Sequence, residues 1–311
     1  MSYRLAALIV AVCIDVVFGD PPNALHPTAW MGSFIRLLSK HTPKDKRAGV
    51  QFLYGSVIVA LGLSLTGIIG VGLARAIEGT GLPWEILLMG AVFKTTFTIR
   101  GLMKASQEIS QALDVKDLVE ARRLTAWHLV SRDTKRLNES ELSAAVVESM
   151  AENTSDSIIA PWLYFFLFGL PGALMYRFAN TADAMLGYRD EKHEWLGKAP
   201  ARMDDLLNLI PARLTALLFI AATPFLCGDI QKAIRVWRRD HGLTSSPNAG
   251  NPMSAAAGVL GIRLEKVGHY TLGEGQRAAK PEDIKRMARL MVIASGIGVL
   301  LLAVIILGLC V

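Results

Sequence analysis

The chain has 311 residues, of which 52% are hydrophobic and 19% are charged, and its net charge is +6. Soluble domains carry about 25% charged residues, so this composition argues against an ordinary soluble protein and predicts an integral membrane protein. Nucleic-acid binding is also disfavoured, because Arg235, Arg238 and Arg239 lack interleaved stacking aromatics apart from Trp237.

The N-terminal third contains apolar segments of different strength. Leu5–Ile14 is interrupted by Asp15 and is followed by no small-residue cleavage site, so we interpret it as a retained segment and not a signal peptide. Val50–Ala74 contains no charge and exceeds the ~20 residues that a helix needs to cross the hydrocarbon layer. A weaker segment, 84–93, follows the connection 78–83, which has almost no basic charge and therefore predicts a non-cytoplasmic turn.

The polar region 94–157 comes next, and its helical pattern is interrupted near Asp114 and at 131–138. Two apolar segments with internal prolines follow it, at 158–176 and 206–227. Broken segments are tolerated at membrane depth only where protein or a wet cavity satisfies the freed backbone groups. They predict spans, half-spans or re-entrant helices that line a site, and the sequence leaves the choice open for 158–176.

Leu290–Val311 is a final stretch without charge, long enough to span. Together the segments predict an all-α integral membrane protein, a polytopic helical bundle with broken or re-entrant helices and polar cytoplasmic loops. We expect a single membrane-embedded domain over 1–311, with polar loop regions at 94–157 and 229–289. The second loop and the stretch 36–47 are rich in basic residues, which predicts a cytoplasmic location for both.

The first polar motif begins at Asp15, at the edge of an apolar helix, where an ionisable group is costly and is a functional candidate by default. Asp20 follows, and then Pro21-Pro22 and His26-Pro27 hold the strip extended. We take Asp15, Asp20 and His26 as candidate binding residues. The alternative is a helix end with acidic caps and a stiff turn.

The second motif starts at Asn138, whose spacing to Glu141 is that of a reciprocal helix cap. Acidic residues then recur on one helix face, where like charges four residues apart are unfavourable unless a divalent cation or a cationic substrate group neutralises them. Polar residues crowd the end of this helix just before an apolar segment. The alternative is a solvated acidic face. The candidates are Glu148, Glu152, Asn153, Ser155 and Asp156.

The third and fourth motifs lie between 177 and 213. Asp204 and Asp205 stand four and three residues before Asn208, and an acid pair with an amide suits a hard cation such as Mg²⁺. Each motif alone is also explained by helix caps that the helix dipole favours. The candidates are Asn180, Asp183, Arg189, Arg202, Asp204, Asp205, Asn208 and Arg213.

The fifth motif is the turn 245–252, in which Asn248 and Gly250 open a helix and offer backbone N–H groups to an anion such as phosphate. A plain surface turn explains it equally well. The sequence contains no Ser-His-Asp arrangement, no P-loop and no dinucleotide fingerprint. The three cysteines all fall inside apolar segments without metal-type spacing, which is typical of small apolar residues.

These motifs together resemble the CbiB/CobD family of cobalamin biosynthesis, the adenosylcobinamide-phosphate synthases. The matching stretches are Asp15–Pro22 with His26-Pro27, "SRDTKRLNESE", "ESMAENTSDSIIAP", "NTADAMLGYRDEKHEWLGKAPARMDDLLNLIPARLTALL" and "SSPNAGNPMSAAAGVLGIRLE". They occur in the family's order and cover about residues 10 to 275. Departures from the family pattern are Ala182, Ala184, Asn251 in place of an expected aromatic, and Leu272-Gly273-Glu274.

The resemblance implies an ATP-dependent ligase that joins a propionate carboxylate of adenosylcobyric acid, a corrinoid, to the amine of aminopropanol or its phosphate. Its cofactors would be ATP and Mg²⁺. It implies a multi-pass protein of the cell membrane, in contact with lipid, with its active site facing the cytoplasm, and an association with other membrane enzymes of cobalamin biosynthesis. It implies no nucleic-acid partner.

Roles follow from the demands of that reaction. The hypothetical metal ligands are Glu152, Asp183, Asp204 and Asp205. The hypothetical phosphate partners are arginines, because a planar guanidinium holds phosphate in bidentate fashion: Arg132, Arg189, Arg202 and Arg213. Glu148 or Asp156 would accept the proton that the incoming ammonium loses. The remaining binding candidates are Asp15, Asp20, His26, Asn153, Ser155, Asn180, Asn208, Asn248 and Gly250.

Two rival functions belong to other classes. A non-catalytic membrane sensor or scaffold of the AmpE-like type would explain the spans but leave the Asp, Asn and Arg clusters without a role. A cation-coupled transporter would use Asp15 and Arg213 as intramembrane pathway residues, and broken helices permit it. The absence of paired inverted repeats in the sequence argues against the transporter.

Overall fold

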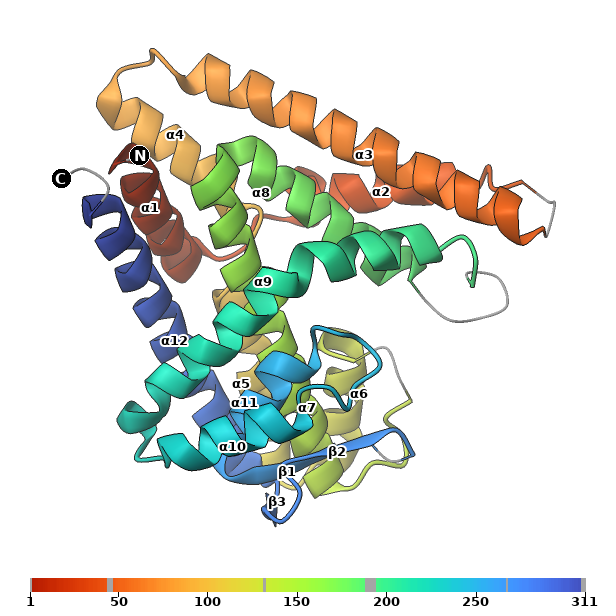
Figure 1. Ribbon diagram of the computed structural model, residues 1–311, viewed down its shortest axis with the longest axis vertical. Helices are drawn as coiled ribbons and strands as arrows, with labels where there is room; N and C mark the ends of the chain where they lie inside the picture. Colours follow the sequence, from red (N-terminus) through yellow and green to blue (C-terminus); the bar gives the residue numbers. More distant parts are fainter. Residues whose placement is uncertain (1, 44–46, 131–132, 188–193, 267, 309–311) are drawn as a thin grey trace. The chain divides into compact units, whose positions relative to one another are not determined.

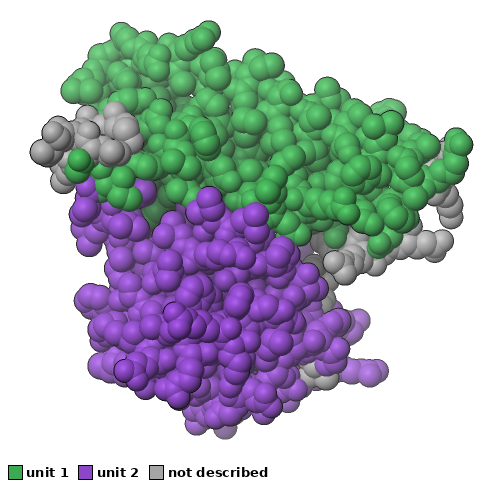
Figure 2. Space-filling view, in the orientation of Figure 1, with its two compact units in different colours: residues 1–98, 160–208, 305–311 green, residues 99–159, 209–304 purple. Residues whose placement is uncertain are grey.

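The computed structural model of the protein describes residues 2–43, 47–130, 133–187, 194–266 and 268–308. The chain divides into two compact units, which Figure 2 colours separately. Unit 1 consists of residues 1–98, 160–208 and 305–311, and unit 2 consists of residues 99–159 and 209–304.

Unit 1 is helical in its described parts. Its elements are α1 (Ser2–Phe18), the short η1 (Asn23–Leu25), α2 (Pro27–Ser39), α3 (Ala48–Ile77), α4 (Leu82–Lys94), α8 (Ala160–Leu186) and the first part of α9 (Lys198–Ala222) (Figure 1). Helix α3 packs along α8, and α1 packs along α4. Apolar side chains of α2, α3 and α8 form a core in which Ile35, Ile58 and Phe178 are almost completely buried.

Helix α8 is broken inside the apolar segment 158–176. Gly169 has φ 70° and ψ −157°, a conformation open to glycine and costly for other residues. Pro171 follows and has no N–H for the helical hydrogen-bond ladder. The prediction of a broken helix in this segment is therefore confirmed, and its cause is the Gly-x-Pro sequence.

Unit 2 is built around α7 (Glu139–Thr154), most of whose residues are buried. Helices α5, α6 and α11 and strand β1 pack against it. The elements of unit 2 are α5 (Arg100–Asp114), α6 (Leu118–His128), α7, the π-helical turn η2 (Ser155–Ile159), the rest of α9, η3 (Thr223–Leu226), α10 (Ile230–Asp240), α11 (Gly250–Leu260), β1 (Ile262–Lys266), β2 (Tyr270–Leu272), β3 (Arg277–Ala278) and most of α12 (Pro281–Gly308).

A small sheet has the strand order β2-β1-β3. Strand β1 pairs antiparallel with β2, where Leu264 lies opposite Leu272, and parallel with β3. Both leucines are completely buried. The sheet was not predicted. Within the polar regions 94–157 and 229–289, apolar residues recur with a period that buries one face of a helix, as on α5 and α10.

Among the described residues, four helical stretches are long and apolar enough to cross a membrane: Ala48–Ile77, Glu139–Leu186, Lys198–Leu226 and Pro281–Ile306. The predicted all-α membrane class is confirmed, with the small sheet as an addition. Helices α1 and α4 are not among these four stretches, because they have only 17 and 13 residues.

Candidate functional site

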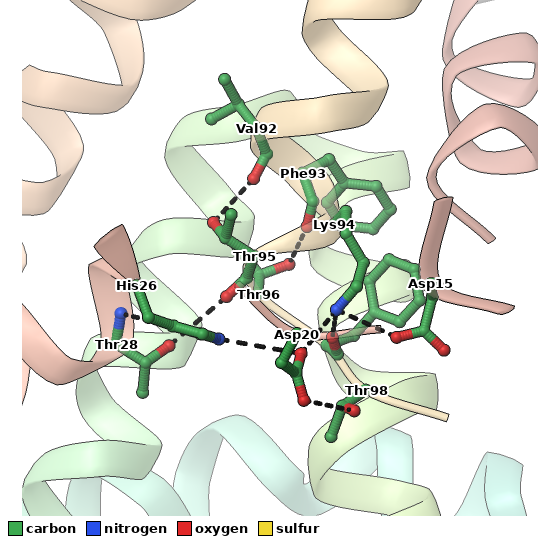
Figure 3. Close-up of polar contacts among 11 residues, drawn as sticks. Asp15, Asp20, His26, Thr28, Val92, Phe93, Lys94, Thr95, Thr96 and Thr98 are labelled. Carbon is green, nitrogen blue, oxygen red and sulfur yellow. Dashed lines mark hydrogen bonds and ion pairs between the residues drawn. The ribbon is translucent and has the colours of Figure 1, made fainter. Parts of the chain in front are cut away.

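A buried lysine organises the first motif (Figure 3). Lys94 lies at the end of α4, and its Nζ is 2.9 Å from Oδ1 of Asp15 and 2.6 Å from Oδ1 of Asp20. Thr98 donates a hydrogen bond to the other oxygen of Asp20, at 2.9 Å. We call Asp15, Asp20, His26, Lys94 and Thr98 the Lys94 cluster. The ion pairs of Lys94 join the end of α4 to Asp15 on α1 and to Asp20, which directly precedes Pro21 and Pro22.

His26 is held in a defined tautomer within this cluster. The backbone N–H of Thr28 donates to Nδ1 at 3.2 Å, so His26 caps the start of α2 and a neutral ring carries its proton on Nε2. That Nε2 lies 3.7 Å from Oδ1 of Asp20. Burial disfavours the charged form of Asp20, but hydrogen bonds from His26, Lys94 and Thr98 outweigh it and hold the pKa of that carboxyl well below its usual range.

The exposure of the Lys94 cluster separates a structural part from an accessible part. The side chains of Asp15 and Lys94 are 0% and 2% exposed, whereas those of His26 and Asp20 are 16% and 35% exposed. A ligand therefore has access to Asp20 and His26 first. Lys94 was not among the predicted site residues. The available signal was Asp15 itself, because a carboxylate in an apolar helix needs a cationic partner.

A second cluster in unit 1 centres on Asp204. Asn180 of α8 donates to Oδ1 of Asp204 at 3.3 Å, and Asn208 of α9 donates to Oδ2 at 2.9 Å. The hydroxyl of Tyr176 donates to the amide oxygen of Asn208 at 2.8 Å, and Arg177 donates to that of Asn180 at 3.4 Å. We call these five residues the Asp204 cluster. The tyrosine and the arginine fix the orientation of the two amides, and the amides fix the carboxylate.

The sequence spacing correctly placed Asp204 and Asn208 within reach of each other. It also placed Asn180 on a face of its helix with Arg177, which it contacts. Asp204 and Asn208 are buried, while Asp183 and Asp205 are half-buried and Arg202 is exposed. Arg189, and likewise Arg132 of the earlier motif, lie outside the described residues.

The acidic motif of unit 2 lies on α7 and η2. The reciprocal cap between Asn138 and Glu141 is confirmed, with hydrogen bonds of 2.8 and 3.0 Å. Glu148 is 6% exposed, so this helix does not present a uniformly solvated acidic face. The helix widens into a π-turn at Ser155–Ile159, a distortion that occurs frequently at functional sites.

Around that π-turn the polar side chains contact one another. Asn153 donates to the backbone oxygen of Ser149 at 2.9 Å and accepts from Ser157 at 3.3 Å. Ser155 is buried, and Glu152 and Asp156 are half-buried. These contacts hold the polar end of α7 in one arrangement.

The turn before α11 is exposed at Ser245 and Pro247 and becomes buried as the helix begins. Asn248 is buried and accepts a hydrogen bond from Arg213 at 3.5 Å, which brings two predicted binding residues together. Gly250 lies against the backbone carbonyl of His241, so that a Cβ there would overlap it. Asn251, which departs from the family pattern, is also buried and accepts from the indole of Trp237 at 3.1 Å.

The predicted metal ligands belong to different units: Asp183, Asp204 and Asp205 to unit 1, and Glu152 to unit 2. Among the residues that the structure describes, no three His, Cys, Asp or Glu side chains are grouped to hold a metal ion. Mg²⁺ is usually bound through one or two carboxylates together with water and substrate phosphates. The oriented carboxylate of Asp204 beside the half-buried Asp205 fits that kind of site, and the four-ligand set stays a prediction.

Comparisons with known proteins agree with the motifs. The sequence model of the CobD/Cbib protein family matches residues 8–291. The chain is 45% identical over 280 residues to the cobalamin biosynthesis protein CobD of Dehalococcoides mccartyi, covering 90% of each chain. It is 37% identical to a probable CobD of Methanocaldococcus jannaschii over 86% of this chain and 88% of that one.

A probable CobD of Pyrococcus furiosus is 38% identical over 97% of this chain and 98% of the relative. No solved structure matches the chain. The resemblance that the polar motifs predicted is confirmed by a family match that covers most of the sequence: this chain belongs to the CobD/Cbib family.

Proposed function

We propose that the chain acts in cobalamin biosynthesis as a membrane-bound, ATP-dependent amide ligase. Its reaction would join aminopropanol, or its O-phosphate, to the corrin propionate of adenosylcobyric acid. The observation that carries the proposal is the Asp204 cluster, because Asn180, Asp204 and Asn208 lie in one of the stretches that resemble the family and hold a buried carboxylate in a fixed orientation.

Amide formation from a carboxylate needs an activated acyl group. In the proposed reaction a propionate oxygen attacks the γ-phosphoryl group of ATP and ADP leaves. The amine then attacks the acyl carbon, phosphate leaves, and the ammonium proton goes to a base. When bound, Mg²⁺ would neutralise charge on the phosphoryl oxygens. Asp204 and Asp205 would hold it, with Asn180 and Asn208 keeping the Asp204 carboxylate oriented.

The remaining roles are proposals of the same kind. In unit 1, Asp183 would add a metal ligand, and Arg202 and Arg189 would contact phosphate. In unit 2, Arg213 with Asn248 and the N-terminus of α11 at Gly250 would do the same, together with Arg132. Glu148 or Asp156 would accept the proton, and Glu152 would be a metal ligand. Asn153 and Ser155 of unit 2, with Asp20, His26 and the buried Asp15 of unit 1, would position the substrates.

The environment suits this assignment. The four candidate spans support a multi-pass protein of the cell membrane. The basic residues of 229–289 favour a cytoplasmic face for that region, where ATP is available. An association with other membrane enzymes of the same biosynthesis would pass the large corrinoid from one site to the next.

The test is product formation by the purified full chain in detergent. It would be supplied with adenosylcobyric acid, aminopropanol phosphate, ATP and Mg²⁺, and the amide product would be measured by mass spectrometry. We expect Asp204→Asn and Asp205→Asn to lower the rate about 10²–10³-fold, the usual cost of losing one oriented charge-stabilising group.

The matched control is Asp229→Asn. Asp229 caps α10 by accepting from Lys232 N–H, and asparagine caps a helix about as well. This variant should keep the rate of the unmodified chain. Equal rates in all four proteins would refute the assigned roles of Asp204 and Asp205, and absence of product from the unmodified chain would refute the ligase itself.

A further inference from the structure

Unit 2 contains a groove of about 1030 Å³ that the proposed reaction does not use. It lies between α5, η3 and the first turns of α12, and none of the residues assigned to the reaction lines it. Its volume is at the upper end of the ~300–1,000 Å³ typical of small-molecule pockets. Its lining includes Gln107, Ser110, Phe225, Lys285, Arg289 and Val292.

One rim of the groove is cationic. Lys285, Arg286 and Arg289 line it against a single acid, Asp114. Lys285 is paired with Asp114 at 2.7 Å, and Arg286 is paired with Asp283 at 2.9 Å. Arg289 is exposed and has no acidic partner within the described parts of the chain. The groove therefore keeps an excess positive charge, and Arg289 is the cation most available to a ligand.

The same face of α12 changes from charged to apolar at Arg289. Val292, Gly296 and Leu300 follow it at helical spacing, and no charge occurs from Leu290 onward. Val292 is 47% and Leu300 66% exposed, so the apolar stripe is open. Arg289 thus stands immediately before the uncharged part of the candidate span Pro281–Ile306, where a cation would meet both the polar headgroups and the hydrocarbon of a bilayer.

The other walls have the same mixed character. Phe225 on η3 is 69% exposed at the end of a second candidate span, Lys198–Leu226. On α5, the amide of Gln107 lines the groove, and Ser110 is 2% exposed with a hydroxyl that has no hydrogen-bond partner. Buried hydroxyls are normally satisfied, so this unpaired donor points to a polar ligand group that reaches it.

We infer that this groove binds an anionic phospholipid. Its phosphate would contact Arg289 and Lys285, its glycerol oxygens would reach Ser110 and Gln107, and an acyl chain would lie over Val292 towards Leu300. Basic pockets beside membrane helices bind anionic headgroups in this way. A soluble phosphate would use the cations but leave the open apolar stripe without a partner, which is why the lipid is the occupant that fits.

The experiment is native mass spectrometry of the full chain in non-ionic detergent, titrated with phosphatidylglycerol or phosphatidylcholine. We expect tighter binding of phosphatidylglycerol. Arg289→Gln should weaken it about fivefold, the effect of losing roughly one surface cation, and leave phosphatidylcholine unchanged. Val292→Trp, which fills the groove without altering charge, should weaken both lipids. Arg136→Gln removes an exposed charge elsewhere in unit 2 and should change neither.

Several outcomes would overturn the inference. Equal affinity for the two lipids would show that the groove does not select an anionic headgroup. An Arg289→Gln protein that binds phosphatidylglycerol as tightly as Arg136→Gln does would show that the lipid does not bind at Arg289. Displacement of phosphatidylglycerol by glycerol 3-phosphate would identify a soluble phosphate as the ligand. Displacement by adenosylcobyric acid would assign the groove to the substrate. The lipid measurement does not depend on catalysis, so it stands or fails separately from the proposed ligase.

Discussion

Replacement of Lys94 by methionine tests the Lys94 cluster most severely. Methionine keeps much of the side-chain volume but removes the ammonium that lies 2.9 Å from Asp15 and 2.6 Å from Asp20. Asp15 is 0% exposed, so its carboxylate would then be buried beside an apolar group. Removing one partner of a buried ion pair typically costs about 3–5 kcal/mol. We expect a loss of stability of that size.

The assay is unfolding of the purified protein by SDS in mixed micelles, followed by circular dichroism. Asp15→Asn combined with Lys94→Met removes the stranded charge, so the double variant should be more stable than Lys94→Met alone. Lys104→Met is the control, because that lysine is 74% exposed and 3.9 Å from its partner, and it should cost less than ~1 kcal/mol. Additive losses in the double variant would refute the reasoning, because they would mean that the two residues do not interact.

Three further predictions concern other sites. The pKa of Asp20 lies below the ordinary value of 3.8, so the ionised carboxylate stabilises the fold fully above pH 3.8, and this stabilisation is lost as the pH falls below that value. When stability is measured against pH, Asp20→Asn should therefore reduce the loss of stability in acid, and an unchanged curve would contradict the assignment. Gly250→Ala should cost about 1–3 kcal/mol through overlap with the carbonyl of His241, while Gly242→Ala, with open space around it, should be nearly neutral in the same unfolding assay. Asn208→Leu leaves buried polar partners unsatisfied and should cost about 1–3 kcal/mol; a stability equal to the unmodified protein would show that its hydrogen bonds contribute nothing.

The sequence predicted the features that depend on local pattern. Helices α3 and α12 follow from the length of their uncharged runs, and the start of α7 follows from the cap between Asn138 and Glu141. The break in α8 was expected because its segment contains Pro171. The contact between Asp204 and Asn208 was visible as a helical spacing of four. In each case neighbouring residues determine the outcome.

Features that depend on packing between distant segments were missed. Asp15 was singled out, but its partner Lys94 is 79 residues away and meets it only because α1 packs along α4. The small sheet was missed because its strands have only five, three and two residues, too few for an alternating pattern to indicate a strand. The departure at Asn251 also has a tertiary reason, namely its hydrogen bond to Trp237.

The proposed ligase rests on activation of a carboxylate by ATP, and isotope transfer measures that step directly. Adenosylcobyric acid labelled with ¹⁸O at both oxygens of its propionate carboxylate would be converted by the purified chain with ATP, Mg²⁺ and aminopropanol phosphate. The account predicts one ¹⁸O atom in the released phosphate for each amide formed, because the oxygen that attacks the γ-phosphoryl group leaves with it. Amide formed without ATP, or phosphate released without the label, would contradict it.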